Sequence, residues 1–68
     1  MKATYDKEAD AAYIYLKENI GKGEIKSTIS MNENIILDFD KDKKLIGIEI
    51  LSASKIIPTS SISTLQAA

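Results

Sequence analysis

Cysteine, histidine, tryptophan and arginine are all missing from the 68 residues of this chain. Without cysteine there is no disulfide, and without a set of cysteines and histidines there is no structural zinc site. With no histidine, no cysteine and no serine in an elbow-type context, the chain lacks the common nucleophile and base sets, so we predict that the protein is not an enzyme, has no catalytic residues and uses no cofactor. All nine basic residues are lysine. Because arginine recognises phosphate and guanine through two parallel hydrogen bonds, we expect no nucleic-acid partner.

Long apolar runs are also missing. No stretch approaches the length of a membrane span, and the first ten residues, MKATYDKEAD, lack the apolar segment that a signal peptide needs. The absence of cysteine suits a reducing compartment. We therefore expect a soluble cytoplasmic protein with no membrane partner.

The length of the chain bears on its assembly. Sixty-eight residues make one domain near the lower size at which a single core folds unaided. Since disulfides and zinc are excluded, association is the remaining way to gain stability. We predict a homo-oligomer, most simply a homodimer, or a complex with a small protein partner. The domain is expected over residues 1–58, and the uncharged tail 59–68 is either flexible or packed on an exposed patch.

The clearest pattern is the alternation in NIILDFDKDKKLIGIEILS, residues 34–52. Apolar side chains at every second position predict two antiparallel strands with a turn at residues 41–44. This register lines three apolar pairs along one face: Phe39 with Ile46, Leu37 with Ile48, and Ile35 with Ile50.

Similar alternation indicates further strands at residues 2–5, 11–17 and 24–31, the last of them half-buried. An amphipathic helix over residues 6–17 is the alternative for the second. Asn34 is expected to take a left-handed conformation in a three-residue hairpin loop. A helix over residues 53–57, capped by Ser52 and ended by Pro58, follows the last strand. The sequence thus predicts an α+β domain, a small antiparallel β-meander of four to five strands with a short C-terminal helix.

Two stretches, YDKEADAAYIYL at residues 5–16 and LDFDKDKKLIGIEILSASK at residues 37–55, resemble a family of short uncharacterised bacterial and archaeal proteins classed as a domain of unknown function. The likeness spans residues 1–58. It implies a small antiparallel sheet with a terminal helix and no assigned activity. Some relatives look like companions of small toxin-type proteins, which suggests an antitoxin-like or other partner-binding role. The family commonly has a glycine near the turn where Lys43 stands.

Four acidic residues raise the question of a metal site. Asp38, Asp40, Asp42 and Glu49 match the acidic positions of a calcium-binding loop. The match fails at Lys43, where that loop needs glycine, and strands rather than helices are predicted on both sides. We interpret the four carboxylates as the solvent side of the hairpin. A protein that binds a divalent metal or a small ligand through them is the alternative function.

A second acidic group, Asp6, Glu8 and Asp10, lies between the first two predicted strands. Paired carboxylates perform acid-base chemistry when burial separates their pKa values, but no feature of this segment indicates burial. We interpret it as a turn in which the carboxylates accept hydrogen bonds from backbone N–H groups.

The outer face of the predicted sheet is the candidate functional surface. An aromatic and aliphatic patch with a polar rim is typical of an interaction surface, and the alternative is that the C-terminal helix or the tail covers it. Gly47 belongs to this face and indicates either close approach by another element or a β-bulge. The predicted contact residues are Tyr13, Tyr15, Ile36, Leu45 and Leu51.

Overall fold

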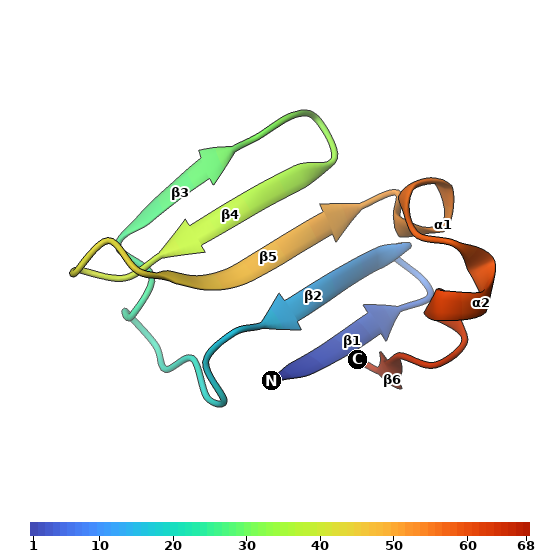
Figure 1. Cartoon of the computed structure of the whole chain (residues 1–68), viewed down its shortest axis with the longest axis horizontal. Helices are drawn as coiled ribbons and strands as arrows, with labels where there is room; N and C mark the ends of the chain where they lie inside the picture. The colour runs from blue at the N-terminus through green and yellow to red at the C-terminus, as the bar shows by residue number, and fades with distance from the viewer.

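One six-stranded sheet carries two short helices near one end (Figure 1). The structure, a computed structural model, describes residues 1–68. The predicted α+β class is confirmed. The elements are β1 (Lys2–Asp6), β2 (Ala11–Tyr15), β3 (Ser27–Ser30), β4 (Ile35–Phe39), β5 (Leu45–Leu51), α1 (Ala53–Ile56), α2 (Thr59–Ile62) and β6 (Gln66–Ala67).

The strands lie in the order β3-β4-β5-β2-β1-β6. A meander is present, but it is confined to β3, β4 and β5, and the β1–β2 hairpin joins it with β2 against β5. Residues 16–26 therefore carry the chain from the middle of the sheet to its edge (Figure 1). The sixth strand, β6, comes from the tail and pairs parallel with β1, whereas every other pair is antiparallel.

The register of the central hairpin is confirmed at two of its three predicted pairs. Ile35 lies opposite Ile50 and Leu37 opposite Ile48, as the period-2 pattern requires. The third pair is different, because the register shifts between Asp38 and Phe39. Phe39 lies opposite Leu45, which leaves Ile46 as the additional residue of a β-bulge.

The structure corrects two local expectations. Residues 11–15 form a strand, so the alternative helix over residues 6–17 is wrong. The prediction of a left-handed Asn34 is also wrong, because its φ is not positive. Instead the side chain of Asn32 shapes this turn, its Oδ1 accepting the N–H groups of Asn34 at 2.7 Å and Ile35 at 2.8 Å.

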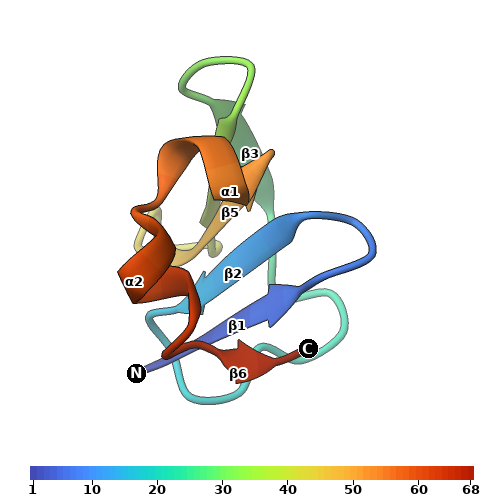
Figure 2. The same cartoon turned by 90° about the vertical axis from the view of Figure 1, so that its right-hand side faces the viewer.

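Both helices lie on one side of the sheet, as the end-on view in Figure 2 shows. The core is small, with Ala12, Ile50 and Ala53 at its centre. No large side chain is fully buried. The tail takes part, since Leu65 packs against this cluster and β6 pairs with β1. Neither helix has the length and apolar character needed to cross a membrane. The other partly buried residues around the cluster are Tyr5, Ile14, Ile48 and Ile57.

Candidate functional site

The face of the sheet opposite the helices carries Tyr13 and Tyr15 of β2, and we call it the tyrosine face. Tyr13 reaches from β2 across Gly47 of β5, and its hydroxyl donates a hydrogen bond to Asp38 Oδ2 on β4 at 2.7 Å. The sequence left open whether Gly47 marks a close approach or a bulge. The bulge is present, with Ile46 as its extra residue, and the group that approaches Gly47 closely is the Tyr13 side chain of the neighbouring strand rather than a covering helix or tail.

Asp38 is buried, with 8% of its surface exposed, so its predicted place on the solvent side is wrong. Its second oxygen, Oδ1, accepts the hydroxyl of Thr28 from β3 at 2.9 Å. These bonds explain how a carboxylate is tolerated here, because buried polar groups are stable only when they are hydrogen-bonded. Burial raises the pKa of the Tyr13 hydroxyl above its ordinary value, and the hydrogen bond to Asp38 raises it further.

A shallow cavity of about 320 Å³ lies beside this network. The two tyrosine rings meet edge to face, with their centroids 4.7 Å apart and an angle of 68° between their planes. The ammonium group of Lys2 lies 4.5 Å from the centroid of the Tyr15 ring. The cavity is lined by Tyr13, Tyr15, Ile20, Ile25, Asp38 and Glu49.

Two of the lining residues, Ile20 and Ile25, come from the 16–26 connection and were not predicted from the sequence. The available signal was that both are isoleucines with polar or glycine neighbours in a largely polar segment. An apolar residue in such a loop commonly packs back onto the fold. The tyrosine face is therefore partly covered by this connection, and not by the C-terminal helix or the tail.

The other predicted contact residues divide between the two faces. Ile36 lies opposite Glu49, and Leu51 lies opposite Ala11, so both belong to the tyrosine face. Leu45 lies opposite Phe39, a residue of the helix side. Its predicted place beside the tyrosines is wrong, because the bulge at Ile46 interrupts the alternation on which that prediction rested.

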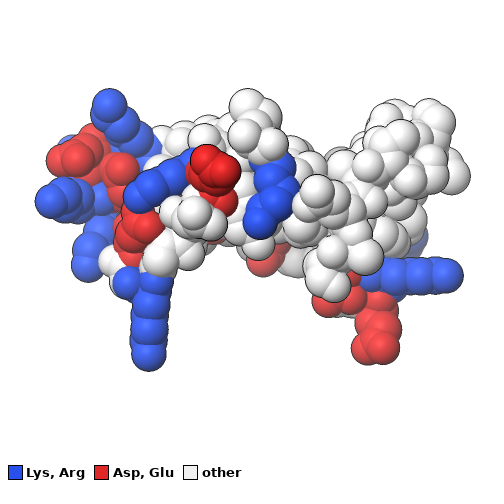
Figure 3. All heavy atoms as spheres, turned by 90° about the horizontal axis from the view of Figure 1, so that it is seen from below, with Lys and Arg blue, Asp and Glu red and all other residues white.

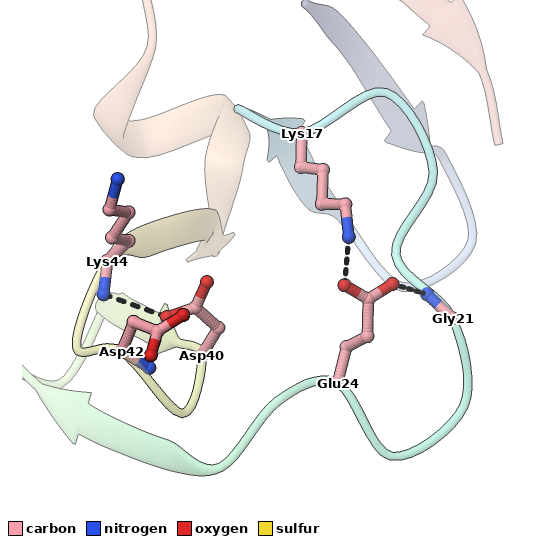
Figure 4. A network of polar contacts seen from close by, with 6 residues as sticks. All are labelled: Lys17, Gly21, Glu24, Asp40, Asp42 and Lys44. Carbon is pink, nitrogen blue, oxygen red and sulfur yellow. Dashed lines mark hydrogen bonds and ion pairs between the residues drawn. The ribbon is translucent and has the colours of Figure 1, made fainter.

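The structure does not bring the four acidic metal candidates together. Asp38 lies under Tyr13, whereas Asp40 and Asp42 belong to the β4–β5 turn (Figure 4). Asp40 Oδ1 accepts the N–H groups of Asp42 at 2.8 Å and Lys44 at 3.0 Å. The bond from Lys44 is the main cause that lowers the pKa of Asp40 from its ordinary value. No group of three acidic side chains is placed to hold a metal ion.

Charged side chains gather at the left end of Figure 3, where the β4–β5 turn and the 16–26 connection lie. Here the Lys17 ammonium pairs with the Glu24 carboxylate, which also accepts the Gly21 N–H at 2.6 Å (Figure 4). The bond from Lys17 is the first cause of the lowered pKa of Glu24. Because the Lys17–Glu24 pair is exposed, its contribution to stability is small, and we regard its role as holding the connection in shape.

Asp10 performs the capping that the sequence assigned to Ser52. Ser52 has a left-handed conformation, with φ 53°, and its side chain makes no capping bond. Instead Asp10 Oδ1 accepts the Ser54 N–H at 3.0 Å and the Tyr5 hydroxyl at 2.7 Å. The bond from Tyr5 is the main cause that lowers the pKa of Asp10, and the same bond raises the pKa of Tyr5.

The interpretation of Asp6, Glu8 and Asp10 as a turn with capping carboxylates is confirmed for Asp6 and Asp10, whereas the Glu8 carboxylate accepts no backbone N–H group. Asp6 Oδ1 accepts the N–H groups of Glu8 at 3.1 Å and Ala9 at 3.3 Å.

Strand β3 is the edge of the sheet, and all four of its residues are exposed. The sequence predicted a half-buried strand over residues 24–31, which is wrong in its burial and in its length, since β3 spans only Ser27–Ser30. The alternation of β3 was read correctly, but no layer covers the apolar side chain of Ile29, which is 54% exposed. The next apolar residue, Met31, is 64% exposed.

Comparison with known proteins gives one match. The model of a family described as a protein of unknown function, DUF2283, matches residues 2–54. The match confirms the resemblance to an uncharacterised family. Neither the curated proteins nor the solved structures give a significant match.

Proposed function

We propose that this chain, which belongs to the DUF2283 family of proteins of unknown function, is a protein-interaction module that forms a homodimer through its edge strand β3. The observation that carries the proposal is the exposure of every residue of β3 together with the exposed apolar side chains of Ile29 within it and Met31 next to it.

The backbone of β3 offers hydrogen-bonding groups to another strand. The Met31 N–H donates to the Ile35 carbonyl at 2.8 Å, so Met31 and, by alternation, Ile29 direct their backbone groups toward β4. The N–H and C=O groups of Thr28 and Ser30 then point away from the sheet. Natural edge strands are commonly protected by proline, lysine or a covering element, and β3 contains neither residue. A second β3, antiparallel to the first across a two-fold axis, would satisfy these groups.

Exposed apolar side chains concentrate on the same edge. Of the six large hydrophobic residues that are exposed, Ile29 lies in β3 and Met31 directly follows it, whereas Ile25 precedes β3 and lines the cavity of the tyrosine face. The helices are at the other end of the sheet and leave this region open (Figure 1). Phe39 of β4 adjoins Ile29 there, in a shallow cavity of about 320 Å³. A partner strand would cover Ile29 and Met31 while it paired with the backbone.

The area of the whole chain supports association. It exposes 4890 Å², about 15% more than the area expected of a compact monomer of 7.5 kDa. A stable interface takes about 800 Å² from each partner, more than a four-residue edge alone supplies. The dimer therefore needs the apolar side chains beside β3 as well as its backbone.

Light scattering after size-exclusion chromatography, run over a range of concentrations, tests the proposal. We expect the wild type at twice its chain mass. Ile29→Lys places a charge in the interface and is expected to give the monomer. Ile56→Lys, on α1, is the matched control, since Ile56 is 43% exposed and lies away from β3, and it should remain dimeric.

Tyr15→Asp tests the alternative interface, the tyrosine face, which the sequence favoured. If the dimer forms through β3, this variant should also remain dimeric. A wild type that stays monomeric at all concentrations would overturn the homodimer, even if the chain then paired with a different small protein. A dimer that survives Ile29→Lys would show that the interface lies elsewhere.

A further inference from the structure

We infer that the cavity on the tyrosine face binds a primary alkylammonium group, carried either by a free amine or by a lysine side chain. The site belongs to the face opposite the helices, and the inference does not depend on the proposed dimer.

The cavity is lined by two acidic side chains that no lysine neutralises. Asp38 and Glu49 both line it, and the single ion pair of the structure joins Lys17 to Glu24, so no lysine pairs with either carboxylate. The two groups that hydrogen-bond to Asp38 are neutral hydroxyls. Charges withdrawn from water are normally paired with an opposite charge. The cavity thus carries negative charge that the chain itself does not neutralise.

The electrostatic surroundings of Tyr13 agree with this description. Burial and the hydrogen bond to Asp38 raise the pKa of the Tyr13 hydroxyl, and the charges of Asp38 and Glu49 raise it further. A cation placed in the cavity would relieve this excess of negative charge.

Aromatic rings line the same cavity. Tyr13 and Tyr15 line the cavity next to the carboxylates, and tyrosine rings attract ammonium groups over their faces. The chain already shows this preference, because the Lys2 ammonium lies 4.5 Å from the Tyr15 ring centroid. This contact leaves both carboxylates unpaired.

The remaining part of the cavity lining is apolar. Ile20 and Ile25 form the apolar part of the lining, so they suit a short alkyl stem next to the charged group. The cavity, at about 320 Å³, is near the lower end of the range for ligand sites, roughly 300–1,000 Å³. An anion would be repelled by the carboxylates. A neutral apolar molecule would displace water from them without giving a hydrogen bond or a charge in return. An alkylammonium ion supplies both the positive charge that the carboxylates lack and an alkyl stem that fits the isoleucines.

The test is a titration of the full chain with n-butylammonium chloride, followed in ¹H–¹⁵N correlation spectra. We expect saturable shifts of the amides of Tyr13, Tyr15, Ile25 and Glu49. Glu49→Gln should weaken binding at least tenfold. Glu33→Gln makes the same charge change in the β3–β4 turn, outside the cavity, and should bind like the wild type. 1-Butanol and sodium butyrate, which have similar stems without the cation, should give no saturable shift.

The source of the ammonium group is distinguished by a parallel titration with Nα-acetyl-lysine amide. Tighter binding of this compound than of butylammonium would assign the site to a lysine side chain, and the reverse order would assign it to a free amine. The inference is overturned if butylammonium gives no saturable shift, if butanol shifts the same amides equally, or if the two glutamine variants bind alike. Should Glu49→Gln fail to fold, the contrast between butylammonium and butanol on the wild type still decides.

Discussion

The hydroxyl of Tyr13 occupies the space in which any side chain at position 47 would begin. A Cβ atom on Gly47 would lie 1.9 Å from the Tyr13 Oη and 2.6 Å from its Cζ. Since Tyr13 comes from β2, Gly47 from β5 and Asp38 from β4, this crossing links three neighbouring strands through one side chain. Glycine is therefore required at position 47 by the path of Tyr13 to Asp38.

Gly47→Ala is expected to destabilise the fold by about 1–3 kcal/mol, the usual cost of forcing extra atoms into a packed site. The methyl group would displace the Tyr13 ring and break its bond to Asp38. Urea denaturation followed by circular dichroism measures the change in the free energy of unfolding. In a Tyr13→Ala background the same substitution should cost far less, because the obstructing ring is gone. Equal costs in both backgrounds would show that the ring is not the cause.

The β4–β5 turn carries a residue in a conformation that suits glycine better. Lys43 has φ 64°, and the sequence resemblance had pointed to a glycine near this position. Lys43→Gly is expected to stabilise the protein by up to about 1 kcal/mol, because the left-handed conformation no longer strains a side chain. Thermal and urea unfolding measure the gain. Lys44→Gly, next to it and without a positive φ, should not stabilise, and a gain at both positions would point to the loss of lysine charge instead.

The hairpin of β4 and β5 was predictable because its information is local. A slip of one residue would move Ile35 and Leu37 to the wrong face, so the alternation determined the register. The bulge was less predictable. Gly47 indicated an irregularity, but the side chain that crosses it, Tyr13, comes from β2, and its position depends on β2 lying next to β5. The order of the strands is a long-range property that periodicity does not contain.

Two further differences between prediction and structure also arise from contacts between distant parts of the chain. Alternation places Asp38 among polar positions, and only its contacts with Tyr13 and Thr28, 25 and 10 residues away, show that it is buried. Ser52 has the local signature of a helix cap, yet the side chain that caps α1 is Asp10, which accepts the N–H of Ser54, 44 residues away. In each case a polar group from a distant segment replaces the partner that the neighbouring residues suggest.

The Asp10 cap is expected to make the stability of the fold depend on pH. Hydrogen bonds from Tyr5 and Ser54 hold the pKa of Asp10 below its ordinary value in the folded chain. The folded state therefore gains from the ionised carboxylate at pH above about 4, the ordinary value for aspartate, and loses that gain as the pH falls through the lower folded value. The pKa values of Glu24 and Asp40 are lowered too, which gives the same direction. We expect the free energy of unfolding to fall as the pH is lowered from 5 to 2.

Asp10→Asn isolates the contribution of the Asp10 cap to the loss of stability in acid. Asparagine tolerates the left-handed conformation that Asp10 adopts, with φ 51°, so the backbone is preserved while the charge is lost. We expect this variant to be less stable than the wild type at pH 7 and to lose less on acidification, as measured by urea unfolding at a series of pH values. Asp42→Asn is the control, since the Asp42 carboxylate accepts no hydrogen bond. If Asp10→Asn kept the full acid dependence of the wild type, the sensitivity would have to come from the carboxylates at the other end of the sheet.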